Sequence, residues 1–385
     1  MTGKLPLDGI RVVDFTQVYL GPCATQMLAD YGADVIKIEP PEVGDRMRWA
    51  IPGDPAGAQG PIFCSINRNK RSIVLDLRTD AAKEAVRRMI AGADVVASNF
   101  RTGVMERMGF GYDDCAKLNP RIVWAVGSGY GLEGPYVKKG GQDALAQAMT
   151  GVVARRSATD ARMGVPTTTF ADYCAGMHLF QGVLLALMQR ERTGKGQVVS
   201  VSLHDSMIAA QMQEVAVQLM RNRELNWGSL PTNDVFETSD GAFVMIGGFS
   251  RQPMKDIGAA IGRPDLEHDE RFTTHESRTA HRAALHAIMA ERFATDTTAH
   301  WLARLEAQDL LCAPVRTLKA ALADEQVAIN GMVLEADAPW DRLKVAGSPV
   351  HLADAPVAMR RLPPRRGEHT DEILAELGLD RRAAD

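Results

Sequence analysis

Apolar runs alternate with amphipathic segments along the first part of the chain. Five of the runs have the length and composition of buried strands: residues 10–15, 35–38, 72–77, 94–97 and 122–126. Between them, residues 24–31 and 81–90 have the spacing of helices, and Gly32 ends the first of these. Strands that alternate with helices predict an α/β fold with a large, doubly wound, Rossmann-like domain.

The pattern changes beyond residue 226. Before that point we expect a helix, a strand and a long helix, at residues 175–192, 198–203 and 205–221. After it, the apolar runs 235–238 and 242–246 flank Asp240-Gly241, which predicts a hairpin. Helices follow near residues 253–261, 278–293 and 298–307. We therefore expect a discontinuous large domain, residues 1–225 with 331–385, and a smaller α/β domain at 226–330.

Length and charge narrow the range of partners. The 385 residues exceed what one hydrophobic core usually organises, which agrees with two domains. A formal charge of −4 leaves no global positive field for a polyphosphate backbone, so nucleic acid is not an expected partner. Local basic clusters are either solvated surface or a site for one small phosphorylated ligand: Arg68, Lys70 and Arg71, then Lys138 and Lys139.

The cysteines and the first residues of the chain indicate the cellular compartment. Five scattered cysteines without a Cys-x-x-Cys pair fit a reducing cytoplasm. Residues 1–8 lack the basic and apolar regions of a signal peptide, and the apolar stretch 179–188 is too short to span a bilayer. We expect a cytoplasmic protein that does not engage a membrane.

Familiar cofactor motifs are weak or missing. Residues 129–134 fit Gly-x-Gly-x-x-Gly after a strand, but Pro135 and the pair Gly140-Gly141 indicate a loop where a dinucleotide site needs a helix. No Walker loop, Gly-x-Ser-x-Gly elbow or His-Glu-x-x-His occurs, so neither a bound metal nor a permanently bound cofactor is expected.

Asp172 is the best chemical candidate. An Asp just before an apolar helix is ordinarily an N-cap, whose carboxylate accepts amide hydrogens. The same position suits a carboxylate nucleophile, because a helix N-terminus is expected to lower the carboxylate pKa and keep the group ionised.

Scattered motifs give the chain a family resemblance. They include Gly-Ala-Asp-Val-Ile-Lys-Ile-Glu at 32–39 and Thr-Gly-Lys-Gly-Gln at 193–197, and the others lie at 7–15, 69–77, 99–109, 176–178 and 367–370. In order and spacing the sequence resembles the class III CoA-transferases, the family of formyl-CoA:oxalate and carnitine CoA-transferases, over nearly its whole length.

The resemblance implies an activity and a site. It implies transfer of coenzyme A from an acyl-CoA to a carboxylic acid through Asp172 as a covalent nucleophile, in an intertwined homodimer. It also implies a set of residues that line the CoA site: Val18, Leu75, Arg78, Asn99, Phe100 and Arg107. Arg78 and Arg107 would suit phosphate, because a guanidinium offers two parallel hydrogen bonds.

Two departures from formyl-CoA transferase concern the acid. Tyr19 stands where that enzyme has a glutamine, and Gly247-Gly248 stands in place of its mobile tetraglycine loop. Both argue against formate or oxalate. We expect Tyr19 and Trp49 to shape the acid pocket, and the amides near Gly247 and Gly248 to stabilise or shield an oxyanion. The simpler interpretation of the two glycines is the end of a strand.

Two other functions remain open. The α-methylacyl-CoA racemases resemble the same family, but their motif supplies a histidine within Gly-His-Asp, where this chain has Gln142 before Asp143. An amide cannot shuttle a proton, which disfavours a racemase. Asp143 is also interpretable as an N-cap of a helix at 144–149. A silent CoA-binding protein would have lost its nucleophile, whereas Asp172 is present.

Overall fold

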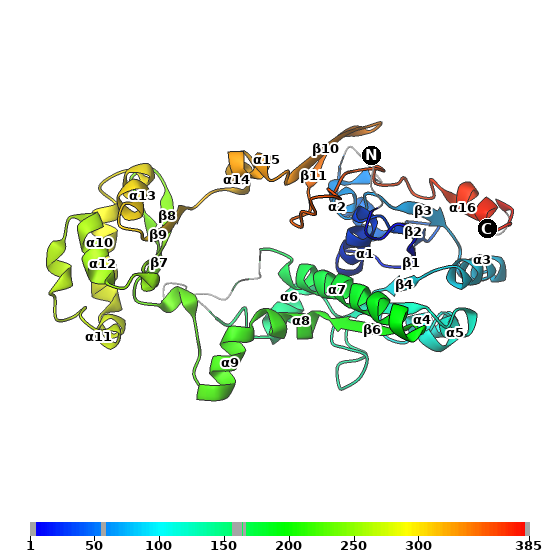
Figure 1. Ribbon diagram of the computed structural model, residues 1–385, viewed down its shortest axis with the longest axis horizontal. Coiled ribbons are helices and arrows are strands. Elements are labelled where there is room, and N and C mark those ends of the chain that lie inside the picture. Colours follow the sequence, from blue (N-terminus) through cyan, green and yellow to red (C-terminus); the bar gives the residue numbers. More distant parts are fainter. Residues whose placement is uncertain (1–4, 55–58, 156–163, 165–166, 382–385) are drawn as a thin grey trace. The chain divides into compact units, whose positions relative to one another are not determined.

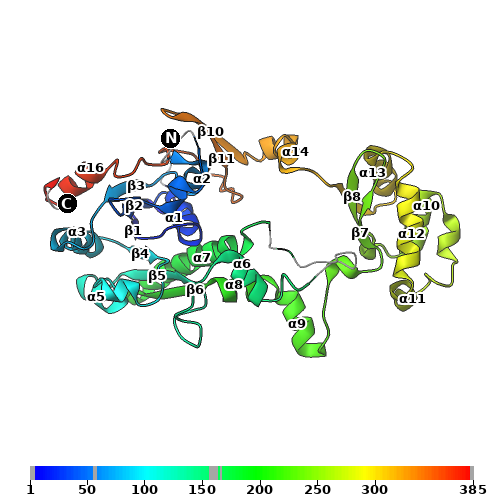
Figure 2. The same cartoon turned by 180° about the vertical axis from the view of Figure 1, so that it is seen from behind.

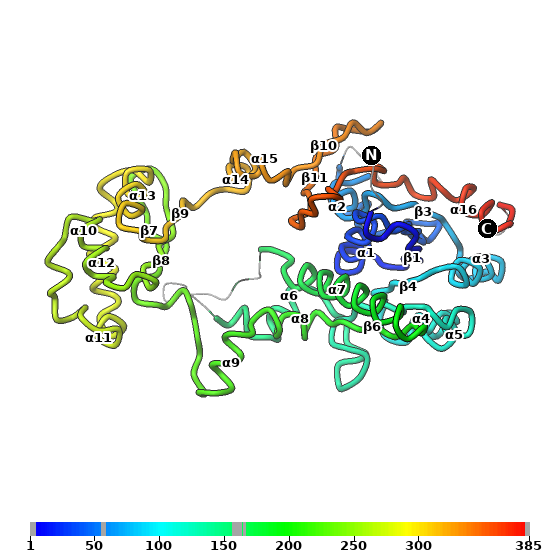
Figure 3. Tube along the Cα trace, in the orientation of Figure 1, coloured from blue at the N-terminus to red at the C-terminus, as the bar shows by residue number. Residues whose placement is uncertain are grey.

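The computed structural model describes residues 5–54, 59–155, 164 and 167–381. The chain divides into two compact units, the first formed by Met1–Val153, Gly164–Met212 and Glu325–Asp385, and the second by Ala154–Met163 and Gln213–Asp324. Figure 3 follows the chain as it leaves the first unit after α8 and returns to it at α15. The corresponding sequence-based boundaries were 226 and 330. The intertwined homodimer stays a prediction.

The first unit is built on a parallel sheet of six strands, in the order β3-β2-β1-β4-β5-β6 (Figure 1). Its strands are β1 (Arg11–Asp14), β2 (Asp34–Glu39), β3 (Arg71–Val74), β4 (Val95–Ser98), β5 (Val123–Ser128) and β6 (Gln197–Ser202). All six were predicted as strands from their apolar runs. The strand order reverses between β1 and β4, and ligands of open parallel sheets bind beyond the carboxyl ends of the strands at such a point.

Helices cover both faces of this sheet, because successive strand residues point in opposite directions. Val12 packs in the core with α1 (Leu20–Asp30), α6 (Asp143–Met149), α7 (Phe170–Thr193) and α8 (Leu203–Ala210). Val13 packs in the other core, with α3 (Asp80–Ala91), α4 (Val104–Arg107), α5 (Tyr112–Leu118) and α16 (Thr370–Glu376). Both views of the ribbon show α1 beside α7 (Figures 1 and 2).

Helix α7 carries Asp172, the candidate nucleophile. Its 24 residues have the length and apolar composition of a membrane span. Leu179 and Val183, however, lie in the sheet core, and Arg190 forms an ion pair with Asp94 at 2.9 Å. A Cβ on Gly176 would approach the carbonyl oxygen of Leu20 to 2.8 Å, so glycine at this position permits the close packing of α7 on α1.

Four ion pairs are buried in the first unit. They are Asp14–Lys70, Asp30–Arg68, Lys37–Asp45 and Glu39–Arg48, with N···O distances of 3.2, 2.6, 2.8 and 2.6 Å. Arg71 is also buried, and it pairs with Asp34, Glu372 and Glu376. The basic cluster at 68–71 is therefore neither solvated surface nor a ligand site, because its charges are neutralised inside the fold.

Three short helices and a hairpin complete the first unit. Strands β10 (Val333–Ala338) and β11 (Asp341–Ala346) pair antiparallel, and Leu343 and Val345 pack on Phe63 of α2 (Pro61–Ser65). The 3-10 helix η1 (Arg46–Trp49) lies between β2 and α2, and α15 (Glu325–Ile329) precedes the hairpin. The sequence analysis did not predict this hairpin.

The second unit has an antiparallel sheet in the order β7-β8-β9. Its strands are β7 (Asn233–Glu237), β8 (Ala242–Ile246) and β9 (Leu311–Pro314), and its helices are α9 (Met212–Arg221), α10 (Pro253–Ile261), α11 (His275–Ala280), α12 (Arg282–Phe293), α13 (Thr298–Glu306) and α14 (Leu318–Leu322). The short 3-10 helices are η3 (Trp227–Ser229), η4 (Gly247–Phe249) and η5 (Pro264–Glu267). The prediction of a single helix at 205–221 is wrong, because the helix is interrupted at Gln211. The Gln211 side chain donates a hydrogen bond to the carbonyl of Met207 at this point.

Candidate active site

Asp172 lies in the first turn of α7 and is half-buried. The helix starts five residues earlier than expected, so the N-cap position belongs to Thr169, whose side chain makes no capping bond. The interpretation of Asp172 as an N-cap is therefore wrong. Its own backbone N–H donates instead to Asp143 Oδ2 at 2.9 Å, so a carboxylate from another helix satisfies this free amide of α7.

Asp143 is fixed in place at the start of α6. It is buried, and its Oδ1 accepts a hydrogen bond from Gln147 Nε2 at 2.6 Å. The N-cap of α6 is Gln142, whose side-chain oxygen accepts from the Ala144 N–H at 3.1 Å. The interpretation of Asp143 as the N-cap of its own helix is therefore wrong. Its carboxylate instead accepts a hydrogen bond from the backbone of the neighbouring helix at Asp172.

The surroundings of Asp172 raise its pKa to about 6. Burial is the main cause, the charge of Asp143 adds to it, and a backbone hydrogen bond from Leu20 acts in the opposite direction. The expectation that the helix N-terminus would lower this pKa is wrong, because desolvation and a like charge outweigh it. At pH 7 the ionised form still exceeds the protonated form by about tenfold.

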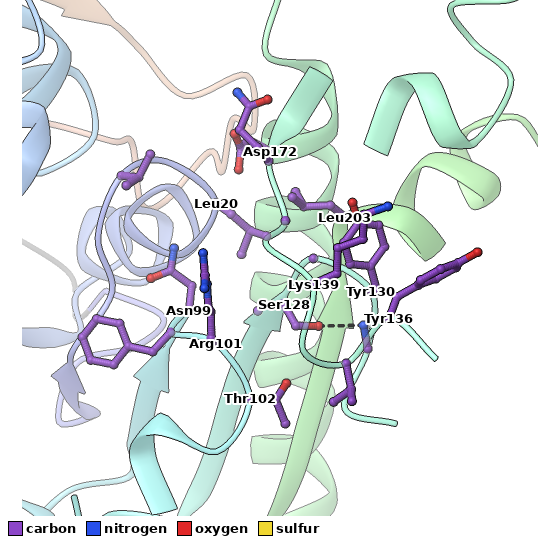
Figure 4. Close-up of a pocket in the computed structure, with 18 residues that line it drawn as sticks. Leu20, Asn99, Arg101, Thr102, Ser128, Tyr130, Tyr136, Lys139, Asp172 and Leu203 are labelled. Atoms are coloured by element: carbon purple, nitrogen blue, oxygen red, sulfur yellow. Dashed lines mark hydrogen bonds between the residues drawn. The ribbon is translucent and has the colours of Figure 1, made fainter. Parts of the chain in front are cut away.

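A first cavity of about 260 Å³ opens beside Asp172 (Figure 4). Three residues of the implied CoA site line it: Val18, Asn99 and Phe100. Figure 4 shows Asp172 at one end near Leu20, with Asn99 and Arg101 on one side and Tyr130, Tyr136 and Lys139 on the other. Two cations and several hydroxyl groups therefore share the walls of this cavity.

A second cavity of about 690 Å³ also reaches Asp172. The two cavities share Val18, Gln142 and Asp172. Tyr19 lines the second one, and burial, together with Cys23 and Asp172, raises the pKa of its phenol to about 12. Tyr19 is therefore neutral over the whole physiological range. Asp172 is accessible from two separate spaces, which suits a group that exchanges one partner for another.

Leu75 and Arg78 lie at a further cavity, of about 390 Å³, which Phe100 also lines. Arg78 is exposed and pairs with Asp76 and Glu42, each at 2.7 Å. A phosphate at this site would have to replace these carboxylates as partner of the guanidinium.

Two predicted residues lie outside these cavities. Arg107 is exposed at the end of α4 and lines none of the three. Trp49 is also exposed, its indole N–H donates to the Val43 carbonyl, and it lines neither cavity at Asp172. Trp49 was expected to shape the acid pocket, but Met47, two residues earlier, lines the second cavity instead.

The turn between β1 and α1 forms the wall between the two cavities at Asp172. Val18 has φ of 72°, a left-handed conformation that strains a β-branched residue. The turn is held by a reciprocal pair of hydrogen bonds between Gln17 and Asn99, of 2.8 and 2.7 Å. The Val18 N–H also donates to Asp45 at 3.3 Å. Asn99, predicted as a CoA contact, therefore also anchors the turn that Val18 occupies.

Gly247 and Gly248 belong to the second unit, where they begin η4 directly after β8. The Gly247 N–H donates to the Thr232 carbonyl at 3.2 Å, so this amide is not free for an oxyanion. A Cβ on Gly247 would come within 3.0 Å of Thr232 Cβ, so packing accounts for this glycine. A catalytic role of Gly248 stays a prediction.

The sequence analysis missed several residues of the first cavity. Arg101, Ser128, Tyr130 and Tyr136 were not proposed, and Lys139 was noted only as part of a basic pair. The signal was the Gly-x-Gly-x-x-Gly segment, which we discarded as a dinucleotide motif. Its glycines serve another purpose, since a Cβ on Gly129 would lie 2.5 Å from the Gly141 Cα, where two loops cross at the cavity wall.

Comparisons with known proteins agree with one another. The model of CoA-transferase family III matches residues 7–370. An acyl-CoA transferase of Fusarium pseudograminearum is 36% identical, over 98% of this chain and 86% of the relative. A succinyl-CoA:glutarate CoA-transferase of Mus musculus is 33% identical, over 97% and 86%. The crystal structure of a CAIB/BAIF family protein from Brucella suis superposes with a TM-score of 0.86 at 31% identity, over 97% of this chain and 100% of the other.

Proposed function

Because the chain belongs to CoA-transferase family III, we propose that it moves coenzyme A from an acyl-CoA donor to a carboxylic acid, with Asp172 as covalent nucleophile. The observation that carries this proposal is the position of Asp172, a half-buried carboxylate that lines two cavities at once. The CoA moiety of a thioester substrate can lie in one cavity while its acyl group lies in the other.

The proposed chemistry needs no proton transfer. An oxygen of the Asp172 carboxylate attacks the thioester carbonyl carbon, the C–S bond breaks, and CoA leaves as a thiolate. The acyl group and Asp172 are then joined as a mixed anhydride. The thiolate then attacks the Asp172 carbonyl carbon, and the anhydride C–O bond breaks to release the donor acid as a carboxylate. The aspartyl-CoA thioester that remains reacts with the acceptor carboxylate by the same steps in reverse.

Charge and position support Asp172 in this role. The group is ionised at neutral pH without a general base, and its raised pKa gives it more basicity than an exposed aspartate has. Asp143 holds the backbone of Asp172 through its carboxylate, while Leu20 donates its backbone N–H to the Asp172 side chain. Orientation of this kind lowers the barrier, because the reacting atoms meet without further loss of freedom.

The CoA moiety is assigned to the first cavity and to the cavity at Leu75. Phe100 lines both, so we assign a long substrate to the path that runs from Arg78 past Phe100 to Asp172. Arg101 and Lys139 supply cations along the first cavity for the phosphate groups.

The two alternatives have less support. A racemase needs an acid and a base at the α-carbon, and Gln142 offers an amide whose oxygen already accepts the Ala144 N–H. A silent CoA-binding protein would not need an ionised carboxylate between two cavities. The second substrate is proposed as a carboxylic acid, a class that includes the dicarboxylic acids in the name of the mouse relative.

Trapping of the covalent intermediate tests this function. With an acyl-CoA donor and no acceptor, an aspartyl-CoA thioester should form on Asp172, where hydroxylamine converts it to a hydroxamate and borohydride to an alcohol. Peptide mass spectrometry should find either product on the segment 170–177. A proton-shuttling racemase forms no adduct, so deuterium uptake into the α-position of a 2-methylacyl-CoA without any adduct would favour that alternative.

The pH dependence of adduct formation follows from the pKa of Asp172. Because the nucleophile is the ionised form, the second-order rate constant of adduct formation, measured in a single turnover without acceptor, should be constant above pH 7 and should fall about tenfold per unit well below pH 6. The substitution Asp143→Asn removes a charge that raises this pKa, so the acidic limb should move to lower pH. Asp113→Asn, at an exposed position of α5, is the control and should leave the limb in place. An unshifted limb in Asp143→Asn would contradict the assigned charge interaction.

A further inference from the structure

We infer that the second cavity receives an apolar acyl chain, so that this enzyme prefers medium-length monocarboxylic acids to dicarboxylic acids. The inference rests on the proposed function, because it assigns the acyl group on Asp172 to the larger of the two cavities that this residue lines.

The walls of the second cavity are apolar over most of their extent. Met27 of α1, Met47 of η1, Ile62 and Ile66 at α2, and Met332 before β10 contribute to them. Methionine side chains adapt to the shape of an apolar ligand because they are unbranched and flexible. With about 690 Å³ the cavity lies in the size range that holds a small organic ligand, and it has far more room than a one- or two-carbon acid needs.

Two of the polar side chains in these walls, Arg68 and Gln26, already have protein partners. Arg68 is the one cation among the described residues that line the cavity, and it is fully buried. Its Nε and Nη2 donate to both carboxylate oxygens of Asp30, at 3.0 and 2.6 Å, and its Nη1 donates to the Ala346 carbonyl at 2.8 Å. Gln26 uses both ends of its amide on backbone groups.

A second carboxylate in this cavity would therefore lack a free cation. It would also lie in the same space as the negative charge of Asp172, and it would lose its hydration. An alkyl chain gains from the same surroundings, since each methylene group that leaves water strengthens binding about fourfold. The cavity thus discriminates between the two classes of acid, because it binds an alkyl chain and disfavours a second carboxylate.

A series of acyl-CoA donors tests the inference on the full-length protein. Acetyl-, butyryl-, hexanoyl-, succinyl- and glutaryl-CoA are each offered with a fixed acceptor acid, and the CoA products are measured by mass spectrometry. We expect kcat/KM to rise about fourfold per methylene from acetyl- to hexanoyl-CoA. Hexanoyl-CoA should exceed glutaryl-CoA, which has a similar length but a distal carboxylate, by at least about tenfold.

A single charge in the wall should weaken this preference. Ile62 is 39% exposed on α2, so Ile62→Lys adds an unpaired ammonium to the wall with little disturbance of the core. The ratio of kcat/KM for glutaryl-CoA to that for hexanoyl-CoA should then rise about tenfold. Leu118→Lys is the matched control, because Leu118 is equally exposed, at 39%, on α5 and lines none of the cavities described above. Its ratio should match that of the unmodified protein.

The outcomes separate this inference from the proposed function. Rates that are flat along the series, or that favour succinyl- and glutaryl-CoA, would overturn the inference while CoA transfer itself stands. An equal change of the ratio in Ile62→Lys and Leu118→Lys would also count against it. If none of the five donors is turned over, both the inference and the proposed function fail.

Discussion

Replacement of Asp172 by asparagine should reduce kcat for CoA transfer by about a thousandfold or more. The substitution preserves the size of the side chain but removes its charge, and a neutral amide does not attack a thioester. The fold should be unaffected, because the hydrogen bond that joins this position to Asp143 comes from the backbone N–H. CoA binding should persist as well, since most of the first cavity is formed by other residues.

Three measurements check this result: CoA products by mass spectrometry, CoA affinity by calorimetry, and circular dichroism of the folded chain. Asp205→Asn is the control, because it makes the same change at an exposed position of α8. It should leave kcat unchanged. Asp172→Asn with more than about a tenth of the original kcat would show that Asp172 is not a covalent nucleophile, because loss of a nucleophile costs several factors of ten.

The largest effect on stability is expected at Glu39. This carboxylate lies buried on β2, where it accepts hydrogen bonds from Arg48 Nε and Nη2 at 2.8 and 2.6 Å, from Ser72 at 2.7 Å and from the Asp45 amide at 2.8 Å. Burial alone would raise its pKa, but the bonds and charge of Arg48 lower it, so it folds as an anion. Glu39→Gln leaves the Arg48 charge buried without its counter-ion and should lower the free energy of unfolding by about 3–5 kcal/mol.

Urea denaturation followed by circular dichroism measures this loss. The matched control is Glu335→Gln on β10, where the carboxylate pairs with Lys344 and Arg342 at the surface. It should change the midpoint little, because solvent screens exposed pairs. The double substitution Glu39→Gln with Arg48→Met should recover part of the loss, since it removes the unpaired charge. Equal effects of Glu39→Gln and Glu335→Gln would disprove the role assigned to the buried pair.

Local pattern was sufficient for the parallel sheet and for the hairpin of β7 and β8, but not for the hairpin of β10 and β11. Each strand from β1 to β5 contains an apolar run that is recognisable by itself, because both faces of such a sheet are covered. Strands β10 and β11 are half-exposed and carry charged residues such as Glu335 and Lys344. Their sequences resemble loops, and only their pairing with one another makes them strands.

The sequence by itself determined the family, the α/β class and Asp172 as the candidate nucleophile, because these depend on residue types in a given order. The tertiary structure alone decided the environment of that residue. Asp143 lies 29 positions away in the chain, yet it accepts a hydrogen bond from the Asp172 amide and raises the pKa of the Asp172 carboxyl group. Arg68 forms an ion pair with Asp30, so its charge is not free for a ligand. Desolvation and charge interactions depend on distances in space, and residues far apart in the sequence set those distances only when the chain is folded.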